Sequence, residues 1–248
     1  MLHLLWGDMT IGAFAAMALA VFLASLLQSV TGMGFGLVAA PVLALIDPRF
    51  VPVTIIVLGL LVSVLGAWRD RHAMARREIA VAMAGRATGA VVAGWALAVI
   101  TDRQLVSYLF AGTVLLAAVL TGVRWRLSPR PFTLVVAGLA SGLMGTFTSI
   151  GAPPMGLVYQ REPGPKVRAT LNGFFTLGAG VSLAALAAYG HVRLAHLGLA
   201  LGLLPPLLAG TWLSPRVARY ADRRFRVLIL AVCVASSLMI IWRAIAST

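Results

Sequence analysis

The sequence predicts an all-α polytopic membrane protein built from two inverted repeats. Three observations favour this fold class. Of the 248 residues, 60% are hydrophobic and only 11% are charged, whereas a soluble domain carries roughly 25% charged residues. The acidic residues lie in short polar connections or near the N-terminus, and the apolar stretches between them reach roughly 20 residues, enough to cross a bilayer. Two glycine- and proline-rich interruptions occupy matching places in the two halves of the chain.

The first repeat, residues 1–125, begins with a long apolar run that is interrupted over residues 28–41. The sequence there is Gln-Ser-Val-Thr-Gly-Met-Gly-Phe-Gly-Leu-Val-Ala-Ala-Pro. Its three alternate glycines break a helix, because glycine adopts positive φ angles freely. We therefore expect a broken or re-entrant helical hairpin over residues 9–46. Continuous apolar stretches then predict three transmembrane helices, over residues 51–68, 79–100 and 104–123.

The second repeat, residues 126–248, has the same order of elements. Its first apolar run is interrupted over residues 142–154 by Gly-Leu-Met-Gly-Thr-Phe-Thr-Ser-Ile-Gly-Ala-Pro-Pro, which predicts a second hairpin over residues 132–159. Three transmembrane helices are again expected, over residues 169–189, 194–213 and 227–242. Paired interruptions at matching places of two halves are typical of a transporter's binding site.

The distribution of basic residues decides between two topologies for the interrupted segments. If both segments cross the membrane, the loops on its two sides carry seven and eight basic residues, which contradicts the positive-inside rule. If both are re-entrant hairpins, six crossings remain, and fifteen of the twenty basic residues share one side against four on the other. This bias favours the hairpins. It assigns the fifteen residues to the cytoplasm and both termini to the outside.

Polar groups at the two interruptions predict an anion-binding site. Hairpin tips that enter from opposite faces meet near the midplane, where the N-terminus of each return half-helix carries a partial positive charge. Hydroxyl and amide side chains at the same places can donate hydrogen bonds to oxyanion oxygens. The predicted substrate-binding residues are Gln28, Ser29, Thr31, Gly32, Gly34, Gly36, Thr148, Ser149, Gly151, Ala152, Asn172 and Arg86. The alternative is that these small residues only allow helices to pack closely.

Two arginines have open assignments at this point. Arg86 is the one charged residue well inside a predicted span, and a charge there indicates function by default. It lies about two turns from the helix end, so it can instead extend its guanidinium to the membrane surface. Arg168 opens the helix after the second hairpin. It either lines a cytoplasmic vestibule or is a positive-inside charge.

Several classes of function are disfavoured by what the sequence lacks. No predicted span contains a carboxylate, which a cation transporter or an acid-based proton relay needs, so the substrate is expected to be an anion. The four histidines lie outside the spans or at their ends, so an intramembrane protease has no catalytic residues here and we expect no enzyme. We expect no cofactor and no metal site. The net charge of +13 arises from basic residues in the predicted loops. The sequence has no RNA- or DNA-binding motif, so we expect no nucleic-acid partner.

The two interruptions resemble those of the TauE/SafE sulfite-exporter family of anion transporters. The resemblance rests on Gln28-Ser-Val-Thr-Gly-Met-Gly-Phe-Gly with Pro41, on Ser141-Gly, Gly145 and Ser149-Ile-Gly-Ala-Pro-Pro, and on Arg168-Ala-Thr-Leu-Asn-Gly-Phe-Phe. Ala152 departs from the family, in which many members have a second glycine there. The resemblance implies transport of a small anion, sulfite or an organosulfonate such as sulfoacetate, across the bacterial inner membrane.

These observations predict a multi-pass secondary transporter of the cell inner membrane. Its expected partners are a small anionic substrate and the lipid bilayer, and a homodimer is compatible with the sequence. Two alternatives remain open: a membrane scaffold or assembly protein without transport, and an anion channel. The sequence predicts neither a transport direction nor a coupling ion.

Overall fold

The computed structural model describes residues 10–100, 102–122 and 127–218. This part of the chain is helical, without strands. The predicted last span, residues 227–242, lies outside the described residues. The α-helices are α2 (Ile11–Thr31), α3 (Phe35–Ile46), α4 (Val53–Arg69), α5 (Arg76–Val99), α6 (Arg103–Gly122), α7 (Pro131–Thr148), α8 (Ala152–Val158), α9 (Gly164–Ala188), α10 (Leu194–Gly202) and α11 (Leu204–Ala218). Two short 3-10 turns, η1 (Pro48–Phe50) and η2 (Arg71–Ala73), precede and follow α4.

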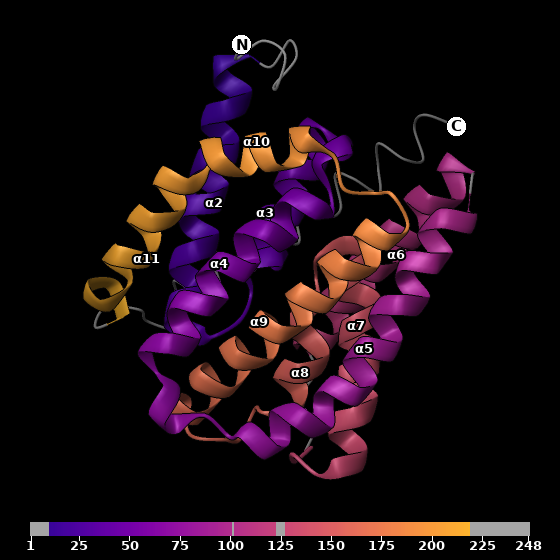
Figure 1. Ribbon diagram of the computed structural model, residues 1–248. Helices are drawn as coiled ribbons and strands as arrows, with labels where there is room; N and C mark the ends of the chain where they lie inside the picture. The colour runs from indigo at the N-terminus through magenta and orange to yellow at the C-terminus, as the bar shows by residue number, and fades with distance from the viewer. Residues whose placement is uncertain (1–9, 101, 123–126, 219–248) are drawn as a thin grey trace.

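The helices form two groups that meet where α4 packs against α9 (Figure 1). One group contains α2, α3, α4, α10 and α11, and the other contains α5, α7, α8 and α9 with α6 beside them (Figure 1). The largest buried apolar cluster joins α2, α3 and α4, and it also takes in Met144 and Ile150 from the α7–α8 region. The two predicted interruptions therefore belong to one packed core.

Both interruptions are present as short breaks between two helices. Gly32–Gly34 separates α2 from α3, and Ser149–Gly151 separates α7 from α8. In each case the two helices pack against each other. Among the described residues, four helices, α2, α5, α7 and α9, are long and apolar enough to cross a membrane, and α10 with α11 would make a fifth span if counted as one. Because α2 and α7 are among them, length alone does not separate a spanning from a re-entrant arrangement.

A glycine seam joins α5 to α7 in parallel. Gly85 and Gly89 on α5 lie against residues 135–143 of α7, while Gly138 and Gly142 on α7 lie against residues 82–90 of α5. A side chain at any of the four would collide with the backbone of the facing helix. Small residues spaced four apart let helices approach this closely in a membrane. The seam fixes α5 and α7 as one rigid unit.

The segment predicted as one helix over residues 194–213 is bent. Helices α10 and α11 meet at an angle of 47° near Leu203, and α10 crosses the top of the molecule in Figure 1. Pro205 and Pro206 follow the bend. Prolines have no N–H to donate to the carbonyls four residues earlier, so the helix cannot continue straight through them. The pair was visible in the sequence as a break signal.

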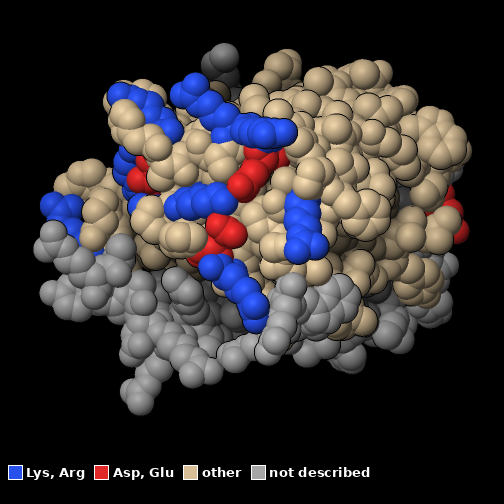
Figure 2. Space-filling model, turned by 90° about the horizontal axis from the view of Figure 1, so that it is seen from below, with Lys and Arg blue, Asp and Glu red and all other residues tan. Residues whose placement is uncertain are grey.

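Basic and acidic side chains gather on the lower end of the molecule (Figure 2). They come from the α4–α5 connection, the α8–α9 connection and the start of α7. We call this end the basic face. Its described basic residues are Arg69, Arg71, Arg76, Arg77, Arg130, Arg161, Lys166 and Arg168. Ion pairs tie its connections together, since Lys166 binds Glu78 at 2.8 Å and Arg168 binds Asp70 at 2.6 Å.

Candidate functional site

The first break is built around the last residue of α2, Thr31. Its hydroxyl donates to the Leu27 carbonyl at 2.9 Å and accepts from the Met33 amide at 3.3 Å. The next residue, Gly32, turns into the left-handed region with φ 83°. The side chain of Gln28, one turn earlier, accepts a hydrogen bond from the Phe35 amide at 3.1 Å. Gln28 therefore caps α3, whose first N–H groups have no partner in their own helix.

The second break repeats this local design around Thr148. Its hydroxyl donates to the Met144 carbonyl at 2.8 Å and accepts from the Ile150 amide at 3.2 Å. The next residue, Ser149, is again left-handed, with φ 66°, and is the one non-glycine residue with positive φ in the described chain. Its hydroxyl donates to the Pro52 carbonyl at 3.0 Å. Helix α8 then begins at Ala152, followed by Pro153 and Pro154.

The two breaks touch each other. Gly36, in the first turn of α3, lies against the carbonyl of Ser149, so that a Cβ on residue 36 would collide with it. Gly32 also lies close to the backbone of Arg168 in α9, where a Cβ would be 2.6 Å from the Arg168 Cα. Both contacts need a residue without a side chain. The glycines thus bring the first break against the second break and against α9.

A cavity of about 60 Å³ lies where the breaks meet. Side chains and backbone from α2, α3, α4, α5, α7, α8 and α9 line it. The lining residues are Gln28, Gly34, Phe35, Gly36, Ile55, Ile56, Gly59, Ser63, Arg86, Gly145, Ser149, Gly151, Ala152, Phe175 and Ala179. By volume the cavity holds about two water molecules, since each takes about 30 Å³ in the liquid.

Arg86 supplies the one charge in the wall of this cavity. Its side chain is only 4% exposed, so the guanidinium does not extend to the membrane surface. One terminal nitrogen donates to the Ser141 carbonyl at 2.6 Å and to the Ser141 hydroxyl at 2.8 Å, and the other donates to the Ser182 hydroxyl at 3.2 Å. The Nε atom is buried without an acceptor. No carboxylate among the described residues forms an ion pair with Arg86.

Three glycines leave the space that the guanidinium fills. A Cβ on Gly145 or on Gly151 would lie 2.8 Å from a terminal nitrogen of Arg86, and a Cβ on Gly178 would lie 2.6 Å from its Nε. Ser141 also donates to the Gly151 carbonyl at 2.6 Å. The guanidinium is therefore held against the second break by a slot without side chains. Its position is set by α7 and α9 and not by its own helix.

The amide of Gln28 joins three helices beside the cavity. It donates to the Ser63 hydroxyl of α4 at 3.1 Å and to the side-chain oxygen of Asn172 in α9 at 3.2 Å. All three side chains are buried. The Nδ2 atom of Asn172 has no acceptor, and the absence of a side chain at Gly66 makes room for it.

The cavity brings together seven of the predicted substrate-binding residues: Gln28, Gly34, Gly36, Ser149, Gly151, Ala152 and Arg86. Asn172 lies next to it through its bond to Gln28. The other four do not line the cavity. The hydroxyls of Thr31 and Thr148 form hydrogen bonds within their own turns. Gly32 packs on α9, and the Ser29 hydroxyl is buried without a hydrogen-bond partner.

Sequence reasoning missed the polar partners that hold the site together. Ser63 and Ser182 lie inside ordinary apolar helices, and nothing near them in sequence marks them as special. Ser141 and Gly145 were noticed only as parts of the family-like motif. A helical-wheel comparison would have placed Ser63 on the α4 face that carries Gly59 and Gly66, which is the only local signal available.

The comparisons with known proteins give one match. The family model described as "Sulfite exporter TauE/SafE" matches residues 17–240, most of the chain. No curated protein and no solved structure matches. In the described part of the chain, no group of three or more histidine, cysteine or acidic residues could hold a metal ion.

Proposed function

Because the chain belongs to the TauE/SafE sulfite exporter family, we propose that it is a secondary transporter whose cavity between the two breaks binds a small oxyanion. The family is one of multi-pass membrane transporters for sulfite and related anions. Sulfite is the substrate that we propose for this chain. The proposed binding side chain is Arg86, together with backbone N–H groups of the first break. Gln28 and Ser149 line the cavity, but their side chains already donate to Ser63, Asn172 and Pro52.

The unpaired guanidinium of Arg86 carries this proposal. A buried charge is costly in a membrane unless a partner of opposite sign compensates it. The hydrogen-bond acceptors of Arg86 are neutral oxygens of Ser141 and Ser182. Its guanidinium also lies 5.6 Å from the centre of the Phe174 ring, and its Nε donor has no acceptor. An oxyanion in the cavity would supply the missing negative charge, because guanidinium groups bind oxyanions with paired N–H donors.

The size of the cavity favours a compact anion. About 60 Å³ is the volume of about two water molecules in the liquid. Sulfite has one sulfur and three oxygens and is the more compact anion, whereas sulfoacetate adds two carbons and a carboxylate. We therefore place organosulfonates second. They would need a wider conformation of the cavity.

We propose further that the two broken elements are re-entrant hairpins of an inverted repeat, with the basic face in the cytoplasm of the inner membrane. The pair of hydrogen bonds that Thr31 and Thr148 share supports two related hairpins. The clustering of arginines on one end supports the orientation, since such an end is typically cytoplasmic. Alternating access would then move one repeat against the other around the cavity.

The test is uptake of sulfur-labelled sulfite by proteoliposomes containing the purified protein. We expect saturable uptake. In Arg86→Gln we expect apparent affinity to fall by more than about tenfold, because loss of one member of a buried charge pair costs about 2–5 kcal/mol. Arg77→Gln is the matched control, because Arg77 lies on the same helix but is exposed on the basic face. Its uptake should equal that of the wild type.

Three outcomes would count against the proposal in different ways. No uptake of any oxyanion by folded protein would favour a scaffold. Uptake that never exceeds equilibrium under any ion gradient would favour a channel. Normal uptake in Arg86→Gln would keep the transporter and remove Arg86 from the site.

A further inference from the structure

Two helix faces lead from the cavity to the basic face. On α4, Gly59 and Ser63 line the cavity, and Gly66 and Arg69 continue the same row at helical spacing. On α9, Ala179 and Phe175 line the cavity. Asn172 and Arg168 continue that row toward the start of the helix. Since α4 and α9 pack against each other, the two rows lie together between the cavity and the basic face.

An inner polar layer lies next to the cavity. It consists of the Gln28 amide with its bonds to Ser63 and Asn172. These neutral groups are buried, and the Asn172 Nδ2 atom and the Ser29 hydroxyl beside them have no partners. Because these buried donors lack acceptors, a rearranged layer can form hydrogen bonds that the present one does not have. This lowers the free-energy cost of rearrangement.

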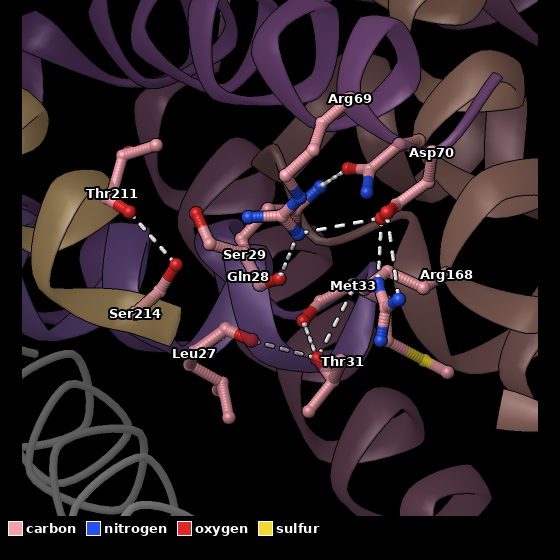
Figure 3. Close-up of polar contacts among 11 residues, drawn as sticks. Leu27, Gln28, Ser29, Thr31, Met33, Arg69, Asp70, Arg168, Thr211 and Ser214 are labelled. Carbon is pink, nitrogen blue, oxygen red and sulfur yellow. Dashed lines mark hydrogen bonds and ion pairs between the residues drawn. The ribbon is translucent and has the colours of Figure 1, made fainter. Parts of the chain in front are cut away.

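An outer charged layer lies at the basic face itself, and Figure 3 shows its contacts. The Asp70 carboxylate accepts from the Arg168 Nε at 2.6 Å and from an Arg69 terminal nitrogen at 3.3 Å. Arg69 also donates to the Ser29 carbonyl at 2.7 Å, so this layer ties α2, α4 and α9 together. The Asp70 side chain is 15% exposed and that of Arg168 is 31% exposed. Water reaches both partners, and partly exposed ion pairs contribute little net stability.

We propose that Asp70, Arg69 and Arg168 form a gate across the route between the cavity and the basic face. The structure has this gate closed, with the Asp70 carboxylate in the anion position between two guanidinium groups. When Asp70 leaves, the two arginines become an anion-binding station for an oxyanion moving between the cavity and the basic face. This inference rests on the proposed transport function. The opening and closing of the gate can still be measured without a transport assay.

The test measures access to the cavity by cysteine labelling in nanodiscs. The one native cysteine, Cys233, is replaced by serine, and Ser63→Cys places a thiol in the cavity wall. A sulfonate-bearing methanethiosulfonate reagent is the probe. With Asp70 intact we expect slow labelling. In Asp70→Asn we expect the rate to rise by up to about fivefold, the change in open population that loss of a weak ion pair allows.

Glu78→Gln is the matched control. Glu78 also forms an ion pair on the basic face, with Lys166 at 2.8 Å, but it lies outside the proposed route. Its labelling rate should stay at that of the parent. The exchange of charges in Asp70→Arg with Arg168→Asp should restore slow labelling, which separates gate opening from a general loss of folding. Size-exclusion profiles verify that each variant is folded.

The anion station is tested with a second probe of opposite charge. In Asp70→Asn the sulfonate reagent should label faster than its trimethylammonium analogue, and adding Arg168→Gln should reduce that preference. Equal labelling in Asp70→Asn and its parent, or equal acceleration in Glu78→Gln, would overturn the gate. No charge preference would overturn the station. None of these readouts depends on transport, so they fail or succeed separately from the sulfite-uptake test.

Discussion

The two breaks share a backbone design but differ in what fills the space beside it. Thr31 and Thr148 make the same pair of hydrogen bonds, and each is followed by a left-handed residue. One turn before the threonine, the first break has Gln28, whose amide caps α3. The second break has Gly145 in that place, and the Arg86 guanidinium from α5 occupies the vacant volume.

The two breaks therefore share a backbone geometry but place different chemical groups beside the cavity. The turn itself needs only a threonine and a left-handed residue, so it can be repeated in both halves. The neutral amide of Gln28 satisfies the backbone locally, whereas the glycine at 145 admits a charge from another helix. One break therefore stabilises the fold at the cavity, and the other brings an electrostatic group to it. Four predictions test how far this comparison holds.

The largest effect is expected where the breaks touch. In Gly36→Ala the new Cβ would collide with the Ser149 carbonyl, so the two breaks must move apart. Overpacking of this kind costs about 3 kcal/mol, and sulfite uptake should be lost with it. The measurement is the thermal unfolding midpoint in detergent. Gly180→Ala is the control, since Gly180 has open space and alanine favours the helix by about 0.5–1 kcal/mol. Equal midpoints for the two variants would contradict the contact.

The threonine pair should give matched, intermediate effects. Thr31→Val and Thr148→Val each remove the acceptor of a break amide, Met33 or Ile150. An amide left without an acceptor costs about 1–3 kcal/mol. Both variants should unfold at similarly lowered temperatures. A loss confined to one of them would show that the two turns are not energetically equivalent.

Acid should weaken the first break more than the second, because the Asp70 cluster braces only the first. Burial alone raises the pKa of the Asp70 carboxyl, but hydrogen bonds from Arg168 and Arg69 outweigh it and hold the pKa below 3.8. The folded state therefore binds this proton less tightly than the unfolded chain. The resulting stabilisation is present above the unfolded pKa and is lost as pH falls through the folded pKa.

The measurement compares Asp70→Asn with wild type across pH. The variant should unfold at a lower temperature near neutral pH, and the two midpoints should converge as the pH falls through the lowered pKa of Asp70. A difference that stays constant across this range would contradict the assignment. Glu78→Gln, for which no such brace on the first break exists, serves as the comparison variant.

The smallest effect is expected at the left-handed residue of the second break. Ser149→Gly removes the strain of a positive φ, about 1–2 kcal/mol, and loses the hydroxyl bond to Pro52, about 1 kcal/mol. The net change in unfolding free energy should stay below about 1 kcal/mol. The reverse exchange, Gly32→Ser, should be much more damaging, because its Cβ would lie 2.6 Å from the Arg168 Cα. Similar effects of both changes would contradict the packing difference.

The positions of the breaks followed from the sequence because glycine and proline act through the backbone. Alternate glycines near Gly32 and the prolines after Gly151 limit helix formation wherever they lie. The same local rule accounts for the bend before Pro205. The family-model match confirms the resemblance that these motifs carried.

The polar wall of the cavity did not follow from sequence, because its members meet only in three dimensions. Arg86 finds Ser141 and Ser182 across 55 and 96 residues of chain. A lone serine in an apolar helix has the same sequence context whether its hydroxyl only packs or forms a hydrogen bond to another helix. Thr31 and Thr148 show the converse, since their hydroxyls were available by type but are used within their own turns.

The glycine seam between α5 and α7 has a consequence for how the protein is made. Helix α5 leaves the ribosome with an arginine in its middle, and the acceptors of that arginine, Ser141 and Ser182, belong to helices synthesised later. An arginine at the centre of an isolated helix costs about 2.5–3.5 kcal/mol on insertion. We expect α5 to settle only after α7 closes on it at Gly85 and Gly89. Stable insertion of α5, in the first half of the chain, is therefore expected to depend on synthesis of α7, in the second half.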